Sequence, residues 1–405
     1  MTPLDHAEQA VLGALFLEPA QLDQLAAWLK PEHFAQPTHS ALHTAMLKLR
    51  AADHPAADTK PRDPVPLTWV NATLKEASRH TRGITATYAH HLISACPRPD
   101  HAPVYGRMVL EGATHRTVAR HATRLHQAAL ADMARGAADE TVHHAQILSE
   151  VLADLAHRWG TNPRPLQPPT SHAPAADAAT TQVEEQVLAD EEFLLGCLSA
   201  RPDQLLGCLS ARPDQLLDAV RSLRPSDFAD AGHQQIYRSL GALHHRGEPI
   251  DQLTVLWEVQ RRGALADGTL DTERVLKICA PQFGGAAEYL GEQVVQASLV
   301  RTAALAARQV RALANRDALA PGHLIGYALH ALGPLDDVRH RLGIAHGAES
   351  APPRRAERSG SPPPAARTDA ARARSAAHHA RPSAERVSHR SSTAKTDRPH
   401  RRIPF

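Results

Sequence analysis

Histidine is the residue type whose number and spacing most suggest chemistry in this sequence, with 27 copies in 405 residues. His39 and His43 lie four positions apart in a stretch predicted to be helical, so both would face one side, as paired zinc ligands do. No third ligand of suitable spacing accompanies them. The pattern therefore predicts structural histidines, and we expect neither a metal nor another cofactor.

Cysteine chemistry and the common catalytic motifs give no better candidate. No two cysteines form a Cys-x-x-Cys pair, which predicts reduced, structural thiols at Cys96, Cys197, Cys208 and Cys279. The segment His6-Ala7-Glu8 matches part of a nucleobase deaminase site, but the Pro-Cys-x-x-Cys that such a site needs does not follow. Patterns typical of serine hydrolases, dinucleotide-binding folds and zinc proteases do not occur in the sequence.

A nucleotide-hydrolysing site would need a phosphate-binding loop, Gly-x-x-x-x-Gly-Lys-[Ser/Thr], whose amides and lysine hold the phosphates. None of the six lysines follows a glycine: they are Lys30, Lys48, Lys60, Lys75, Lys277 and Lys395. We therefore expect that the chain is not an enzyme, with no catalytic and no cofactor-binding residues.

The composition favours helices over sheets. Apolar residues make up 42% of the chain and aromatic residues 4%, while Ala and Leu abound and β-branched runs are scarce. No stretch approaches 18 consecutive apolar residues, and the first residues lack the pattern of a secretory signal. These observations predict an all-α protein in the cytoplasm that does not contact membranes.

The expected helices begin near Asp5, whose partner Glu8 three residues later resembles a capping box. Further helices are expected at about 20–29, 37–51, 66–80, 86–95, 100–133 and 139–158. The last two, with a break near Gly136, would form an antiparallel hairpin that projects from a small helical head.

The first and second halves of the chain are copies of one domain. Matches run in order through about 150 residues, at offsets that vary between 183 and 194 residues. The matching pairs include Glu8 and Glu191, Pro31 and Pro225, Phe34 and Phe228, His39 and His233, Leu67-Thr68 and Leu253-Thr254, and Arg116-Thr117 and Arg301-Thr302. Within the second copy, residues 194–204 recur unchanged as 205–215, so an 11-residue unit was itself duplicated.

Residues Gly247 to Val255, followed by Arg261-Arg262-Gly263, carry a family resemblance together with Pro225, Phe228 and His233. This set strongly resembles the N-terminal domain of DnaB-type replicative helicases. The first copy is more divergent, and departs where residues 54–66 form a Pro-rich insertion. The resemblance implies an all-α head with a helical hairpin that packs in a hexameric ring and binds primase. The motor that normally follows this domain is expected to be absent.

Four segments are predicted on this basis. They are a divergent DnaB N-terminal-like domain (1–159, block one), a Pro-rich linker (160–182), a closer copy of the domain (183–345, block two) and a disordered basic tail (346–405). Residues 351–405 carry 13 Lys and Arg against 4 Asp and Glu, a net charge of +9 that leaves −7 for the rest. Such an arm suggests nucleic-acid contacts through Arg354, Arg355, Arg358, Arg367, Arg372, Arg374, Arg381, Arg386, Arg390, Lys395, Arg398, Arg401 and Arg402.

Each hairpin needs a partner because it exposes an apolar stripe. The predicted interface residues are Val109, Leu110, Val118, Leu125, Leu148 and Val151 in block one, and Val294, Val295, Leu305, Leu313, Leu324 and Leu329 in block two. We expect the two hairpins to pair within the chain as a pseudo-dimer, or between chains as a homo-oligomer.

Two classes of function remain open. The first is a non-catalytic interaction protein of DNA replication that binds a helicase, a primase or itself. The second is a nucleic-acid-binding or architectural protein that acts through its basic tail. A weaker alternative is an accessory subunit of a helicase whose motor lies on another chain.

Overall fold

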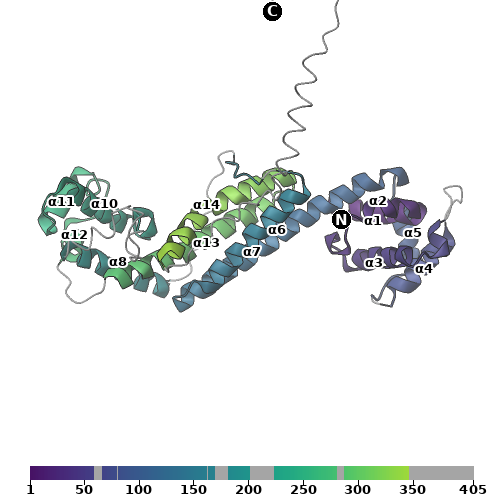
Figure 1. Cartoon of the computed structure of the whole chain (residues 1–405), viewed down its shortest axis with the longest axis horizontal. Helices are drawn as coiled ribbons and strands as arrows, with labels where there is room; N and C mark the ends of the chain where they lie inside the picture. Colours follow the sequence, from purple (N-terminus) through teal and green to yellow (C-terminus); the bar gives the residue numbers. More distant parts are fainter. Residues whose placement is uncertain are drawn as a thin grey trace, which may run out of the picture. The chain divides into compact units, whose positions relative to one another are not determined.

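The computed structural model describes residues 1–58, 66–79, 81–161, 163–168, 181–200, 223–280 and 287–345 (Figure 1). Every regular element in these ranges is an α-helix or a 3-10 helix, which confirms the predicted all-α class. None of the helices described is both long and apolar enough to span a bilayer. Residues 1–349 form one compact unit.

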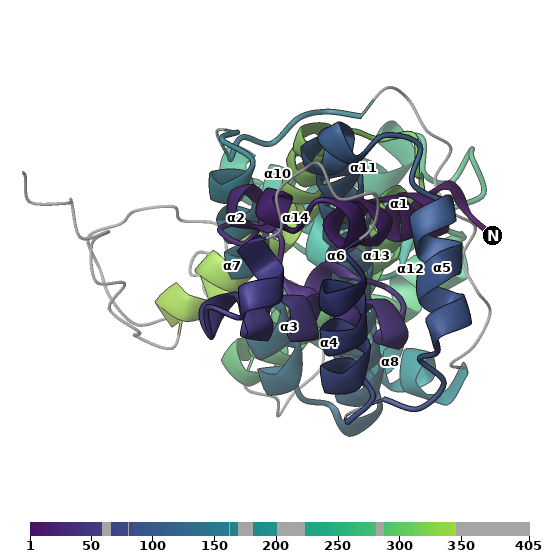
Figure 2. The same cartoon turned by 90° about the vertical axis from the view of Figure 1, so that its right-hand side faces the viewer.

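The first head contains the helices before residue 102, and Figure 2 shows α1, α3, α4 and α5 grouped together. Its elements are α1 (Pro3–Leu17), η1 (Pro19–Gln21), α2 (Leu22–Leu25), η2 (Pro31–His33), α3 (Pro37–Ala51), η3 (Pro55–Asp58), α4 (Leu67–Ala77), α5 (Ala86–Ser94) and η4 (Pro99–His101). The predicted helix over 37–51 is confirmed. The one expected over 20–29 is wrong in extent, because only the single turn of α2 is α-helical there.

The first helix begins earlier than the sequence pattern indicated. Thr2 is the N-cap and Asp5 completes the capping box, since Asp5 N donates to Thr2 Oγ1 at 3.2 Å and Thr2 N donates to Asp5 Oδ2 at 2.7 Å. The predicted role of Glu8 as the capping partner is therefore wrong. Glu8 lies one turn further on, is fully buried, and faces the interior of the head.

The first hairpin consists of α6 (Ala102–Arg135) and α7 (Asp139–Arg158), close to the predicted bounds. Gly136 ends α6 in the left-handed region at φ 63°, as expected of a glycine C-cap. Buried Asp132 fixes the turn by accepting hydrogen bonds from Thr141 N at 2.8 Å and Thr141 Oγ1 at 2.9 Å.

Block two repeats this order of elements. They are α8 (Thr181–Ala200), η6 (Pro225–Asp227), α10 (Ala231–Arg246), α11 (Gln252–Arg261), α12 (Thr272–Ile278) and the hairpin helices α13 (Ala287–Ala314) and α14 (Pro321–Ala345). We refer to α8 to α12 as the second head. The first 11-residue unit begins in α8, where its leucines Leu194, Leu195 and Leu198 are buried. The second unit, 205–215, lies outside the described residues.

Two hydrophobic cores organise residues 1–349, and they do not coincide with the two blocks. One core fills the first head alone, around Leu15, Phe16 and Trp69. The other runs from the second head through all four hairpin helices, and it includes Leu125 of α6 and Leu148 of α7. The outer part of the first hairpin is therefore packed with block two.

The start of the Pro-rich segment is fastened to block two. Leu166 N donates to Gly326 O of α14 at 2.9 Å. A Cβ atom at position 326 would lie 2.5 Å from Leu166 Cδ1, so a larger residue there would require the Leu166 side chain to move.

Candidate interaction interface

The contact between α6 and α13 joins the two blocks. These helices lie side by side over much of their length, with α7 and α14 next to them (Figure 1). His115 of α6 marks one end of the contact: its Nδ1 lies 2.8 Å from Ala314 O and its Nε2 lies 2.9 Å from Leu319 O. These carbonyls belong to the end of α13 and the connection after it, where a helix leaves acceptors without intrahelical partners. His115 therefore caps a helix of the other block.

Small side chains allow the two helices to approach closely. Ala122 and Ala129 of α6 and Ala303 and Ala307 of α13 are all fully buried in the shared core. Ala122 and Ala307 occupy the same position of the repeat, 185 residues apart, as Arg116 and Arg301 do. With His115 beside Ala314, antiparallel helices bring Ala122 opposite Ala307. The hairpins are thus related by an approximate two-fold axis.

The second pair of hairpin helices makes a smaller contact. Arg339 Nη2 of α14 donates to Gln146 Oε1 of α7 at 2.6 Å, and both side chains lie near the surface. Because exposed polar contacts add little stability, the alanine-lined contact of α6 with α13 holds the blocks together.

The structure places most of the predicted interface residues in the shared core. Buried there are Val118, Leu125, Leu148, Val294, Val295, Leu313 and Leu324, while Val151 and Leu329 are half-buried against it. Three residues lie elsewhere. Val109 packs in the core of the first head, Leu110 is half-buried, and Leu305 is 45% exposed. The side chain of Leu305 points away from the hairpin contact because α13 turns that face to the surface.

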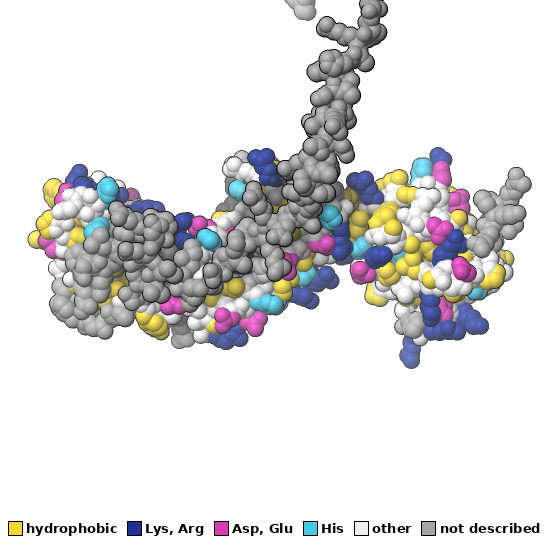
Figure 3. Space-filling view, in the orientation of Figure 1, with side chains coloured by type: hydrophobic (Ala, Val, Ile, Leu, Met, Phe, Trp, Pro, Cys, Tyr) yellow, Lys and Arg dark blue, Asp and Glu magenta, His cyan; other side chains and the backbone are white. Residues whose placement is uncertain are grey.

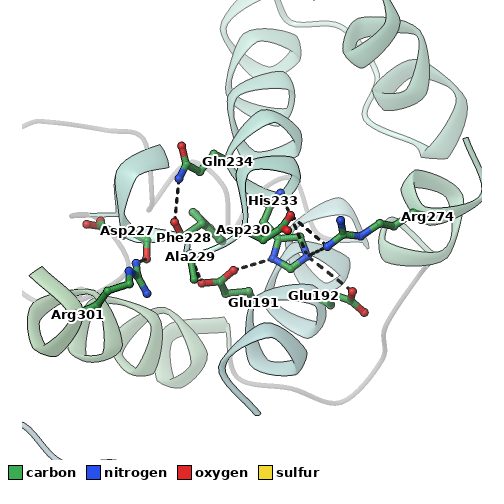
Figure 4. Close-up of polar contacts among 10 residues, drawn as sticks. All are labelled: Glu191, Glu192, Asp227, Phe228, Ala229, Asp230, His233, Gln234, Arg274 and Arg301. Carbon is green, nitrogen blue, oxygen red and sulfur yellow. Dashed lines mark hydrogen bonds and ion pairs between the residues drawn. The ribbon is translucent and has the colours of Figure 1, made fainter. Parts of the chain in front are cut away.

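Each head contains the same buried carboxylate–histidine pair. In block one, His39 Nδ1 lies 2.7 Å from Glu8 Oε2, and Ala35 N donates to Glu8 Oε1 at 2.5 Å. In block two, His233 Nδ1 lies 2.7 Å from Glu191 Oε2, and Ala229 N donates to Glu191 Oε1 at 2.6 Å (Figure 4). Both carboxylates are fully buried, so they cannot reach a substrate. The carboxylate thus fastens the first helix of each head to the first turn of α3 or α10 and to the loop before it.

A repeated arginine connects each head to its hairpin. Arg116 Nη2 of α6 donates to His33 O at 2.6 Å, and Arg301 Nη2 of α13 donates to Asp227 O at 2.7 Å (Figure 4). Burial lowers the pKa of both guanidinium groups from their usual value. In the sequence these two arginines are matching positions of the repeat, and their contact with the head depends on the fold.

The outer side of the pair differs between the heads. His39 Nε2 lies 2.7 Å from the hydroxyl of Tyr88, whereas His233 Nε2 accepts from Arg274 Nη2 at 3.1 Å. Arg274 also pairs with Asp230 at 3.1 Å, and Glu192 lies 3.7 Å from His233 Nε2 (Figure 4). The second head therefore carries a charged cluster where the first has a neutral phenol.

No group of three or more His, Cys, Asp and Glu suited to a metal occurs in the described ranges. His43 lies against Phe34, with ring centroids 5.0 Å apart, and not beside a second ligand. Cys96 and Cys279 are free thiols, Cys197 is buried, and burial raises the pKa of Cys279 to about 11. All thirteen basic residues predicted for nucleic-acid contact, from Arg354 to Arg402, lie outside the described residues, as does Cys208.

Two contacts across the fold were missed from the sequence. One is His115, whose partners lie about 200 residues away in the chain. The other is the buried pair of Asp227 and Arg341, joined by two hydrogen bonds of 2.6 and 2.8 Å. For the second contact the repeat gives a partial indication, because Arg341 and Arg158 occupy matching positions of the two blocks.

The chain is similar to one protein family and to replicative helicases of two bacteria. A family model described as DnaB-like helicase N terminal domain matches residues 3–111 and 202–279, one segment in each block. The replicative DNA helicase DnaB of Geobacillus stearothermophilus is 36% identical over 122 residues, which is 30% of this chain and 25% of the helicase. The replicative DNA helicase DnaC of Bacillus subtilis (strain 168) is 29% identical over 122 residues, with the same shares. The match thus spans a quarter of the length of these relatives.

Proposed function

Residues 3–111 and 202–279 belong to the DnaB-like helicase N-terminal domain family, and from this premise we propose that the chain is a non-catalytic interaction protein of DNA replication. Its two domains pair their hairpins with each other, and the heads are left to bind a replicative helicase or a primase. The observation that carries this proposal is the core shared by α6, α7, α13 and α14.

The shared core supports docking over ring formation. A DnaB-type domain whose hairpin apolar face is covered by its own chain has no need of a neighbouring subunit to cover it. Linking both domains on one chain also favours their pairing through a high effective concentration. The heads then remain as the surfaces that can meet another protein.

Binding to purified partners tests the proposal directly. The full chain should bind a DnaB-type helicase or its primase in sedimentation velocity, without ATP turnover of its own. ATP hydrolysis by the pure chain above background would contradict the non-catalytic assignment. Binding to neither protein would contradict the docking role.

The hairpin pairing has its own test at His115. Replacing His115 with leucine removes the imidazole that lies between the carbonyls of Ala314 and Leu319, and a buried acceptor that loses its donor costs roughly 1–3 kcal/mol. We expect faster amide hydrogen exchange in α13 for His115→Leu. His121→Leu is the matched control, because His121 lies on the same helix and has no hydrogen bond to block two among the described residues. Equal effects of both substitutions would contradict the role of His115.

The charge of residues 351–405 favours a second candidate function, non-specific nucleic-acid binding. The two candidate functions can be distinguished by comparing the binding affinities of the full chain with those of a variant in which all thirteen Lys and Arg of that segment are changed to glutamine. We expect the variant to lose DNA affinity and the salt dependence of that affinity, while it keeps the affinity for the helicase or primase. Unchanged DNA affinity in the variant would exclude the tail as the binding element.

A further inference from the structure

The two heads differ at the position where each meets its hairpin, which is His33 in block one and Asp227 in block two. The fully buried carboxylate of Asp227 accepts from Arg341 Nη1 at 2.6 Å and from Arg341 Nη2 at 2.8 Å. It also accepts from Arg224 N at 2.7 Å, and Asp227 O accepts from Arg301 (Figure 4). In block two an acceptor therefore lies among donors.

In block one the same position presents a donor. Lys30 N donates to His33 Nδ1 at 3.0 Å. Burial lowers the pKa of His33, so its ring is neutral at pH 7 and carries its one proton on Nε2. His33 is 7% exposed, and its Nε2 has no hydrogen-bond partner among the described residues. A nearly buried N–H group thus lies where block two has a carboxylate.

The basic residues around this position are the same in both blocks. Three of them lie close enough to His33 for their charges to lower its pKa, after the larger effects of burial and of Glu32. They are Arg158, Lys30 and Arg116, which match Arg341, Arg224 and Arg301. Arg116 Nη2 donates to His33 O, and its buried Nη1 has no hydrogen-bond partner in the described ranges. Figure 3 shows Lys and Arg side chains at the surface where the first head adjoins the hairpin. Block one thus keeps the donors but lacks the acceptor that they share in block two.

The acidic groups near this position leave its donors able to bind a further anion. Arg158 pairs with Asp154 at 2.8 Å, and the Arg158 side chain remains 52% exposed. The matching Arg341 pairs with Asp337 at 3.3 Å in addition to its buried carboxylate partner, so an arginine here can bind two carboxylates. Glu32 is also near, but it is exposed, and a carboxylate in water gains little from an ion pair.

We propose that the first head binds an oxyanion, a phosphate or a carboxylate group, between His33 and Arg158. The oxygens of the anion accept from His33 Nε2 and from the guanidinium of Arg158, whose planar fork suits an oxyanion. The anion closes the first head on its hairpin, as the carboxylate of Asp227 does in block two. This inference goes beyond the proposed function, because binding of a helicase or primase does not require it.

Native-state hydrogen exchange of the full chain tests the proposal, in sodium phosphate and in sodium chloride of equal ionic strength. Phosphate at ten times its Kd should raise the protection of the first head about tenfold, because it binds the folded head alone. Phosphate also stabilises folded proteins in general, and the second head measures that effect within the same chain. Sodium acetate in a third sample distinguishes the two sources: protection by acetate indicates a carboxylate, and protection by phosphate alone indicates a phosphate group.

Exchange of the two matching residues gives a reciprocal pair of variants. His33→Asp supplies the carboxylate from the chain itself, so the first head should gain protection in chloride and lose its response to phosphate. Asp227→His removes the carboxylate from the second head, which should then acquire a response to phosphate that the wild type lacks.

Arg158→Gln keeps the proposal testable if an exchanged residue prevents folding, because Arg158 lies at the surface. This variant should lose the phosphate response of the first head. Arg98→Gln is the matched control, since Arg98 is 63% exposed and also pairs with an aspartate at 2.8 Å, and it should leave the response unchanged. A first head that gains no more protection from phosphate than the second head, or a response that persists in Arg158→Gln, would overturn the proposal. Circular dichroism of each variant confirms that folded proteins are compared.

Discussion

The heads of the two blocks hold the same carboxylate–histidine pair, yet they differ in the residues that surround it. Buried Asp227 of block two accepts two hydrogen bonds from Arg341, whereas His33 occupies that position in block one and Arg158 pairs with Asp154 at the surface. An ion pair that closes one head on its hairpin is thus missing from the other. The same arrangement of helices is therefore stabilised by a buried ion pair in one head and forms without it in the other.

A second difference lies on α3 and α10. Tyr237 packs on Phe228 with ring centroids 5.0 Å apart, and its hydroxyl donates to Leu223 O at 3.3 Å. His43 packs on Phe34 at the same distance, but neither of its ring nitrogens has a hydrogen-bond partner among the described residues. Because unpaired buried polar atoms cost free energy, we expect the first head to be the less stable.

The largest effect is expected from breaking the ion pair that only block two has. Asp227→Ala leaves the buried guanidinium of Arg341 without its main partner, which costs about 3–5 kcal/mol. Native-state hydrogen exchange of α10 to α13 should report this loss. His33→Ala breaks no ion pair among the described residues and removes the bond that Lys30 N donates to His33 Nδ1, so a smaller loss is expected there, with about 1 kcal/mol from that bond. Equal losses of stability from the two substitutions would contradict the claim that the ion pair of Asp227 with Arg341 adds stability to the second head that the first head lacks.

The acid stability of the two heads should also differ. Burial lowers the pKa of His43 from 6.5 to about 4, so the unfolded chain takes up a proton that the folded head refuses. Above pH 6.5, the first head has its full stability with respect to His43. As the pH falls from 6.5 toward 4, the free energy of unfolding decreases by about 3 kcal/mol. Burial also lowers the pKa of His33, which acts in the same direction.

The first head should therefore open before the second on acidification, as hydrogen exchange at several pH values would show. His43→Tyr, which copies the residue of block two, should remove most of this pH dependence. A first head that keeps its full protection at pH 4.5, or a His43→Tyr variant with unchanged pH dependence, would contradict the assignment to His43.

The features that the sequence predicted correctly are those that depend on neighbouring residues in the chain. Helices over 37–51 and 139–158 and the hairpin break at Gly136 follow from periodicity and turn residues, and they are confirmed. Glu8 was misassigned because the capping-box pattern is local, whereas its true partner, His39, lies 31 residues away. The exposure of Leu305 and the cap made by His115 depend on how the two hairpins pack. Neither sequence spacing nor composition carries that information.

The smallest effect concerns the turn after α3 and α10. Asp53 and Gly247 occupy matching positions, and both are left-handed, at φ 48° and φ 66°. The turn bonds also match, since His54 N donates to Leu49 O as Glu248 N donates to Leu243 O. Aspartate is strained in this conformation and glycine is not, so Asp53→Gly should stabilise the first head by about 0.5–1 kcal/mol.

The reverse change sharpens the same point, because no atom lies within 4 Å of a Cβ placed on Gly247. Gly247→Asp therefore introduces backbone strain without a clash and should destabilise the second head by a similar amount. Urea unfolding followed by hydrogen exchange in each head would measure both changes. If both substitutions changed the free energy of unfolding in the same direction, the difference between the turns would lie in side-chain contacts and not in the left-handed backbone.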